Sequence, residues 1–322
     1  MSERVTVHPL VSPWGRFGLY SFFIDAPEPA IVDTGISSSP LEGMAPALAA
    51  LGRRIEDVRW ILLTHGHIDH VGGAQALWEL TGRRATVVIH EADAPMLRSR
   101  RAHVEEYLTG RGPYLGDPDG EARQVAAAQA VISGEMEPTM IVRGGETISL
   151  GGGVTVSVHA IPGHTPGSVA YVIDGQNDAF VGDAVQIHGA ANGFPGFADP
   201  AAYRASLEYL RDKIRPAHLY LGHPYRTASG EPYGVELDSA QAQNALQESI
   251  DVEGRVSMAA HDCLAHGLEQ SASPYSPFAS VAEAVNYTGN PTLEPSPFFT
   301  TLHGYRTAFE QSTRNEEFFT HD

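Results

Sequence analysis

Three histidines and an aspartate lie within one six-residue segment, His65-Gly66-His67-Ile68-Asp69-His70. The segment directly follows the apolar run at residues 58–64, which predicts a buried strand ending where these polar residues begin. Four such side chains cannot all be core residues, because each buried polar group without a partner costs free energy. A solvated turn is more typically built from Gly, Asn and Ser than from three histidines. The segment therefore predicts a metal site at the end of a strand.

Three further apolar runs, at residues 154–161, 179–181 and 218–221, are also followed by glycine and a possible ligand. They lead to Gly163-His164, Gly182-Asp183 and Gly222-His223. Glycine allows a sharp turn and a close approach of the backbone to a site. Each motif alone is weak evidence, because a histidine after a strand is more often a surface or core residue. Together with residues 65–70, the motifs predict one metal site at one edge of a sheet system.

These motifs, in this order and with Gly163-His164-Thr165-Pro166-Gly167 among them, resemble the metallo-β-lactamase-fold hydrolase superfamily over roughly residues 5 to 225. The resemblance implies an α/β fold, a four-layer αββα sandwich with the metals at one edge between two sheets. The ligands that it implies for one ion are His65, His67 and His164. Those that it implies for a second ion are Asp69, His70 and His223, with Asp183 bridging the two ions.

Imidazole and carboxylate ligands without thiolate suit zinc, iron, manganese or cobalt, and zinc is the usual ion of a hydrolase. We therefore expect two divalent ions, Zn²⁺ in the first instance, with Fe or Mn as alternatives. Two such ions lower the pKa of a shared water and supply a hydroxide that attacks an electrophilic carbon. The catalytic residues expected are Asp69, which would orient the nucleophile, and the bridging Asp183.

This chain departs from the sequence patterns of several branches of the superfamily, and these departures narrow the class of enzyme that we expect. True β-lactamases usually lack a carboxylate at the position of Asp183, and flavin-linked di-iron members carry one at the position of His67. Glyoxalase-II-like thioesterases tend to have a second histidine after the Gly-His-Thr motif, where this chain has Gly167-Ser168. We therefore expect a lactonase-, esterase- or aryl-hydrolase-like enzyme. A mono-iron persulfide dioxygenase and a glyoxalase-II-like thioesterase are the alternatives, and a metal-free scaffold is disfavoured because no ligand is missing.

The composition predicts a cytoplasmic enzyme with a small-molecule substrate. Lys and Arg number 21 against 39 Asp and Glu, a net charge of −18, which disfavours nucleic-acid partners because these need a basic surface. The single cysteine, Cys263, forbids an internal disulfide and suits a reducing compartment. We expect no signal peptide and no membrane partner, since no run approaches the ~18 apolar residues of a membrane span.

The predicted organisation is a catalytic domain at residues 1–234, with an insertion at about 100–138, and an extension at 235–322. The insertion is interpreted as a lid or dimer arm, or equally as a pair of surface helices. The extension is expected to hold helices at 240–250 and 256–268 and to pack on the core or on a partner subunit, giving a possible homodimer. Its aromatic residues are too many for a free tail: Phe278, Tyr287, Phe298, Phe299, Tyr305, Phe309, Phe318 and Phe319.

Within the catalytic domain the patterns predict strands at 5–11, 17–24 and 30–32 and helices at 41–51 and 74–80. The runs 140–150 and 154–161 flank a glycine hairpin turn, and Asp199-Pro200 predicts a helix start. Asp33 is expected to support the metal ligands from behind. The residues expected to line the substrate pocket follow Asp183 or His223 closely, and they are Gln186, His188, Phe194, Phe197 and Tyr225.

Overall fold

The computed structural model describes residues 4–15, 17–190, 193–292 and 296–319. It contains two six-stranded sheets. The strands of the first sheet, in spatial order, are β1 (Thr6–Trp14), β2 (Phe17–Asp25), β3 (Ala30–Val32), β4 (Trp60–Leu62), β5 (Thr86–His90) and β6 (Met140–Val142). Those of the second are β12 (Glu236–Asp238), β11 (His218–Tyr220), β10 (Asp178–Phe180), β9 (Val169–Ile173), β8 (Thr155–Ala160) and β7 (Thr147–Ser149).

The two sheets pack face to face, as the burial of alternate side chains along their strands shows. In β4, Leu62 contacts the core between the sheets, whereas Ile61 packs against helices on the outside. In β9, Tyr171 faces the core between the sheets and Val172 faces outward. Successive residues of a strand point to opposite faces, so each sheet is apolar on both sides. Both sheets must therefore be covered by helices on their outer faces.

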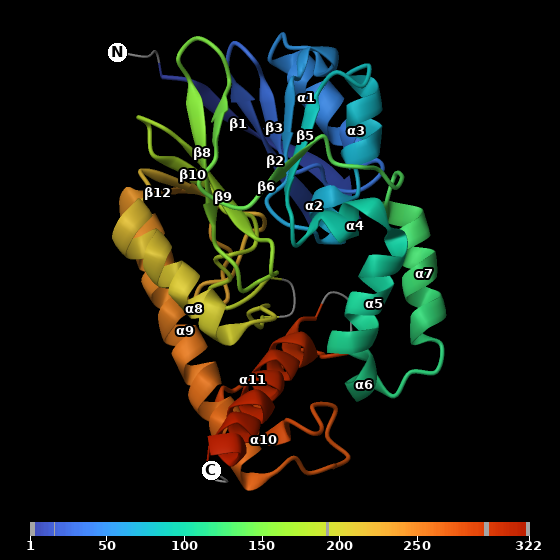
Figure 1. The fold of residues 1–322 in the computed structure, drawn as a ribbon, viewed down its shortest axis with the longest axis vertical. Coiled ribbons are helices and arrows are strands. Elements are labelled where there is room, and N and C mark those ends of the chain that lie inside the picture. Colours follow the sequence, from blue (N-terminus) through green and yellow to red (C-terminus); the bar gives the residue numbers. More distant parts are fainter. Residues whose placement is uncertain (1–3, 16, 191–192, 293–295, 320–322) are drawn as a thin grey trace.

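Those helices complete a four-layer αββα sandwich (Figure 1), which confirms the predicted fold. The first sheet is covered by η1 (Pro40–Met44), α1 (Ala45–Ala50), α3 (Ala74–Leu80) and α4 (Ala94–Arg98). The second is covered by α8 (Pro200–Tyr209), η3 (Leu210–Ile214) and α9 (Ser239–His266). Asp199 caps α8 as predicted, since its side chain accepts a hydrogen bond from the backbone of Ala202.

Two helical regions lie at one end of the sandwich (Figure 1). The insertion forms α5 (Arg100–Gly110), α6 (Gly112–Leu115) and α7 (Gly120–Val131). The extension adds α10 (Ala279–Ala284) and α11 (Phe298–Phe319), and α11 contacts α5. Five of the aromatic residues named above are buried in the core cluster that covers the second sheet, namely Phe278, Tyr287, Phe298, Phe299 and Tyr305. Phe309 is half-buried, and the side chains of Phe318 and Phe319 lie outside the described part.

The predicted glycine hairpin turn joins β7 and β8, which pair antiparallel. Within the run 140–150, β6 belongs to the first sheet and β7 to the second. Gly144 and Gly145, with φ angles of 100° and 98°, make the crossing between the sheets. The two helices expected at 240–250 and 256–268 are one continuous helix, α9. None of the helices in the described ranges is long and apolar enough to cross a membrane.

Candidate metal centre

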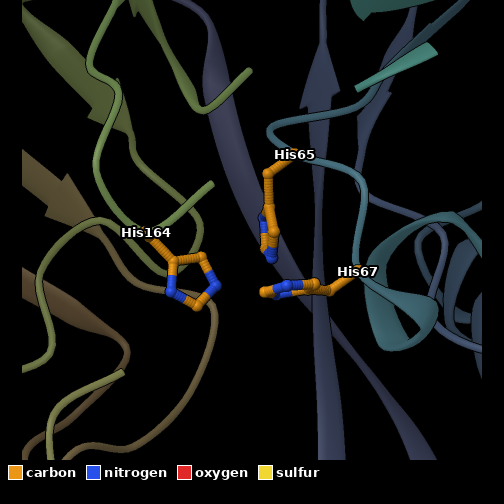
Figure 2. Close-up of side chains that lie close together, drawn as sticks. All are labelled: His65, His67 and His164. Carbon is orange, nitrogen blue, oxygen red and sulfur yellow. The ribbon is translucent and has the colours of Figure 1, made fainter. Parts of the chain in front are cut away.

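The predicted ligands meet at one edge of the sandwich, between the two sheets. His65 and His67 lie on the loop after β4, which continues into the short helix α2 (Ile68–Val71). His164 lies on the loop between β8 and β9, and its ring points toward those of His65 and His67 (Figure 2). The centroids of these three rings are 4.5–4.8 Å apart. Loops after β10 and β11 carry Asp183 and His223 to the same place.

The structure brings all seven predicted ligands together. Their donor atoms form three overlapping groups, and within each group the atoms lie within 4.8 Å of one another. The groups are His65, His67 and His164; His65, His70 and Asp183; and Asp69, His70 and His223. Asp183 lies between the sets, with its carboxylate oxygens 3.4 Å from His70 Nε2 and 3.5 Å from His223 Nε2. The arrangement offers enough donors for two adjacent cations.

Hydrogen bonds orient the rings of His65 and His70. The Thr64 hydroxyl donates to the Asp33 carboxylate at 2.8 Å, so it accepts a hydrogen bond from Nδ1–H of His65 at 3.1 Å. Nδ1–H of His70 donates to Asp33 Oδ2 at 2.8 Å. As predicted, Asp33 therefore supports two ligands, His70 directly and His65 through Thr64. It also accepts a hydrogen bond from the Thr64 backbone N–H at 2.8 Å, which holds the start of the loop that carries the ligands. The Nε2 atom of each histidine is left facing the site.

His164 is held in the same way. Its Nδ1–H donates to the carbonyl oxygen of Gly196 at 2.6 Å. Four buried atoms of the cluster have no hydrogen-bond partner among the described residues. They are the Nε2 atoms of His65, His70 and His164 and the Oδ1 atom of Asp183. Buried polar atoms are almost always paired, and imidazoles that bind metals typically donate their other N–H to a protein acceptor. The residues present therefore fit a bound divalent metal.

The pKa shifts of His65, His164 and Asp183 suit metal binding. Burial, together with the neighbouring histidines, lowers the pKa of His65 well below its usual range and that of His164 to about 4. These rings are neutral, the form that binds metal. Burial alone would raise the pKa of Asp183, but His223 and His70 outweigh it and hold that pKa well below its ordinary value. Because Asp183 stays ionised, it supplies negative charge between the two sets of ligands.

Two supporting carboxylates were not predicted from the sequence. Glu106, on α5 of the insertion, lies with Oε1 at 3.0 Å from His67 Nε2. Asp93 is buried and joins two ligand loops, because it accepts hydrogen bonds from the backbone N–H groups of Gly66 at 2.7 Å and Gly167 at 2.8 Å. It also accepts from the hydroxyl of Thr165 at 2.6 Å. Neither carboxylate lies in a motif or near a ligand in the chain, so no local sequence signal marks it.

A cavity of about 590 Å³ opens beside the cluster. Gln186, Phe194, Phe197 and Tyr225, four of the five residues predicted to line the substrate pocket, line this cavity. The walls also include parts of the chain outside the ligand loops: the β1–β2 hairpin, α5 of the insertion and the start of α11. The predicted pocket is therefore built by the insertion and the extension as well as by the core.

His188, the fifth residue predicted to line the substrate pocket, does not line this cavity. His188 lines a neighbouring cavity of about 550 Å³. Its Nε2 lies 2.8 Å from Glu248 Oε1, and Glu248 also accepts a hydrogen bond from the Tyr233 hydroxyl at 2.8 Å. The carboxylate on α9 therefore holds the ring away from the metal cluster, although His188 follows Asp183 closely in the chain.

Comparisons with known proteins agree with the fold and the motifs. Residues 15–223 match the model of the metallo-beta-lactamase superfamily. The uncharacterized protein YobT of Bacillus subtilis is 31% identical over 209 residues, which cover 61% of this chain and 78% of YobT. A hydroxyacylglutathione hydrolase of Hyphomonas neptunium is 29% identical over 58% of this chain and 55% of its own length. One of Acidiphilium cryptum is 30% identical over 68% of each chain.

Among solved structures, the metallo-beta-lactamase family protein TTHA1429 from Thermus thermophilus superposes with a TM-score of 0.65. The match covers 95% of this chain and 94% of that chain at 21% identity, so the shared fold takes in most of the C-terminal extension. The family model covers well over half of the chain and contains all seven ligand positions. The chain therefore belongs to the metallo-β-lactamase superfamily.

Proposed function

We propose that the protein is a metal-dependent hydrolase that holds two divalent ions, zinc in the first instance, and cleaves a small, partly apolar ester, lactone or activated aryl compound. The observation that carries the proposal is the set of buried Nε2 atoms of His65, His70 and His164, which lie together without a hydrogen-bond partner among the described residues. Ions bound there supply Lewis acids and activate water. The remaining features concern how the chain binds and orients a substrate.

Tyr225 is placed to act as a hydrogen-bond donor in the cavity. Its ring is buried, and its hydroxyl accepts a hydrogen bond from Gln186 Nε2 at 3.3 Å. Burial and the nearby Asp183 carboxylate raise the pKa of Tyr225 well above its usual range, so the phenol keeps its proton at neutral pH. A protonated phenol beside the metal cluster can donate to a substrate oxygen and stabilise negative charge that develops on it.

Asp69 is the ligand best placed to accept a hydrogen bond from a nucleophile. Its carboxylate lines the cavity, and Oδ2 lies 3.1 Å from His223 Nε2. Burial alone would raise the pKa of Asp69, but His70 and His223 hold it well below its ordinary value. The carboxylate is therefore ionised at neutral pH and acts as an acceptor that orients rather than as an acid.

The walls of the cavity favour a substrate with an apolar part. Trp14, Leu19 and Phe197 contribute apolar surface close to the metal ligands, and ligand pockets of this kind place apolar walls around a few polar groups. The net charge of −18 disfavours polyanions such as nucleic acids. A small neutral ester, lactone or activated aryl compound fits both features.

A thioester is the second candidate substrate. The relatives from Hyphomonas neptunium and Acidiphilium cryptum are named hydroxyacylglutathione hydrolase, and an acyl-glutathione carries its acyl group on sulfur. The same ligands and the same cavity would serve such a substrate. A thioester differs from an ester in its leaving group, so paired substrates with the same acyl group distinguish the two candidates.

We expect the zinc-loaded protein to hydrolyse members of a panel of lactones, carboxylic esters, thioesters and activated aryl compounds, because two divalent ions held by these ligands would supply an activated water. A chelator should abolish the activity, and added Zn²⁺ should restore it. A phosphodiester and a persulfide complete the panel. A clear preference for the phosphodiester, or persulfide turnover with oxygen uptake by an iron-loaded protein, would contradict the proposal.

A further inference from the structure

We propose that Glu106, on the helical insertion, is a positioning residue for the metal centre, and that metal binding and docking of the insertion stabilise each other. Glu106 Oε1 lies 3.0 Å from His67 Nε2. A histidine that donates Nε2–H to this carboxylate has Nδ1 as the one ring nitrogen left for a metal. This inference rests on the metal-binding part of the proposed function.

The helix that carries Glu106 presents one face to the metal site. His103, Glu106 and Tyr107 are three and four residues apart, so they lie on the same side of α5, and all three line the cavity beside the cluster. The Nε2–H of His103 donates a hydrogen bond to the carbonyl oxygen of Met96 at 2.9 Å, and this bond connects α5 to α4. Glu106 therefore reaches His67 from a helix that the His103 hydrogen bond also connects to α4.

The returning end of the insertion is attached to the same ligand loop. After α7, the backbone N–H and the hydroxyl of Ser133 both donate to the carbonyl oxygen of Gly72, at 2.7 Å and 2.8 Å. Gly72 lies two residues after His70. The backbone N–H of Ser37 also donates to the carbonyl oxygen of Val131 at 2.7 Å. Both sides of the insertion thus contact the loops that support the metal ligands, so it is a docked wall of the site.

Glu106 differs from the other carboxylates of the cavity. Among the described residues that line it, the acidic ones are Asp69, Asp183 and Glu106, and the first two belong to the ligand groups. Glu106 contacts a ligand without belonging to those groups. A carboxylate that accepts from the second nitrogen of a metal-bound imidazole orients the ring and strengthens it as a ligand.

The contact between Glu106 and His67 couples metal binding to docking of α5. If docking of α5 favours metal binding by holding His67, then metal binding must favour docking of α5 by the same free energy. Zinc should therefore slow hydrogen exchange in residues 100–131 as well as in the ligand loops. A substitution that removes the carboxylate should weaken zinc binding and uncouple zinc from protection of the insertion.

The test uses the full chain and measures zinc affinity by competition with a chromophoric chelator. Glu106→Ala should bind zinc about 10–100-fold more weakly than the wild type, the usual effect of losing such a supporting group. Glu106→Gln keeps an oxygen that accepts from His67 but loses the charge, so its loss should be smaller. The matched control is Glu105→Ala, because Glu105 is exposed and pairs with Arg101 on the same helix, and its affinity should be unchanged.

Hydrogen exchange provides the second readout. Zinc should increase protection of residues 100–131 in the wild type and in Glu105→Ala, and much less in Glu106→Ala. Equal zinc affinity and equal protection in Glu106→Ala and the wild type would overturn the inference and leave the proposed function standing. If Glu106→Ala does not fold, a Glu106→Gln variant that binds zinc as tightly as the wild type would overturn the inference. A wild-type protein that binds no zinc would overturn both proposals together.

Discussion

Asp183→Asn is expected to lower both metal affinity and turnover by roughly a hundred- to several-thousand-fold. The substitution keeps the size of the side chain but removes the negative charge between the two sets of ligands. Asp183 Oδ1 lies 3.4 Å from His70 Nε2, and Oδ2 lies 3.7 Å from His164 Nε2. Removing one charge of a buried pair costs about 3–5 kcal/mol, and each 1.4 kcal/mol is about tenfold in affinity.

The measurement is the zinc content of Asp183→Asn after dialysis against a series of buffered free-zinc concentrations, with turnover measured on the same samples. Asp262→Asn serves as a control for the loss of one aspartate charge, because Asp262 lies exposed on α9, far along the chain from the ligands. Zinc retention and turnover equal to those of the wild type would show that Asp183 does not hold the cations together.

Asp93→Ala is expected to lower the free energy of unfolding by about 2–6 kcal/mol. The substitution leaves the backbone N–H groups of Gly66 and Gly167 without their acceptor, and each buried group left unpaired costs about 1–3 kcal/mol. The effect should be present in metal-free protein, because Asp93 joins the ligand loops directly.

Urea denaturation of the metal-free wild type and Asp93→Ala measures this difference. Asp262→Ala is the matched control, since its side chain is exposed and pairs with His266 on the same helix, and surface changes of this kind usually stay within about 0.5 kcal/mol. A loss for Asp93→Ala no greater than that of the control would mean that the two loops are held together by other contacts.

The parts of the site that could be predicted from sequence are those encoded locally. The segment at residues 65–70 and the pairs Gly182-Asp183 and Gly222-His223 each follow an apolar strand, so strand ends place the ligands. Asp33 was also expected, because Asp33-Thr34-Gly35 ends β3, which pairs with β4 beside the metal loop. The fold followed from the same motifs through the family resemblance.

The parts that could not be predicted depend on partners distant in the chain. His188 lies five residues after Asp183, yet Glu248, 60 residues further on, decides which cavity it lines. Glu106 reaches His67 across 39 residues because the insertion docks on the ligand loop. Within α9, Glu253 is paired with Arg204 at 2.6 Å and with the Tyr305 hydroxyl at 2.8 Å. These pairings allow a buried charge in the middle of one long helix, where the sequence suggested a break.

The most direct test of the central claim is the number of metal ions bound per chain. Elemental analysis of the protein, saturated with Zn²⁺ or Mn²⁺ and then freed of excess metal, should give about two ions per chain, the number that a two-metal hydrolytic site requires. One tightly held ion per chain, unchanged when more metal is added, would contradict the two-metal account and favour the mono-iron alternative.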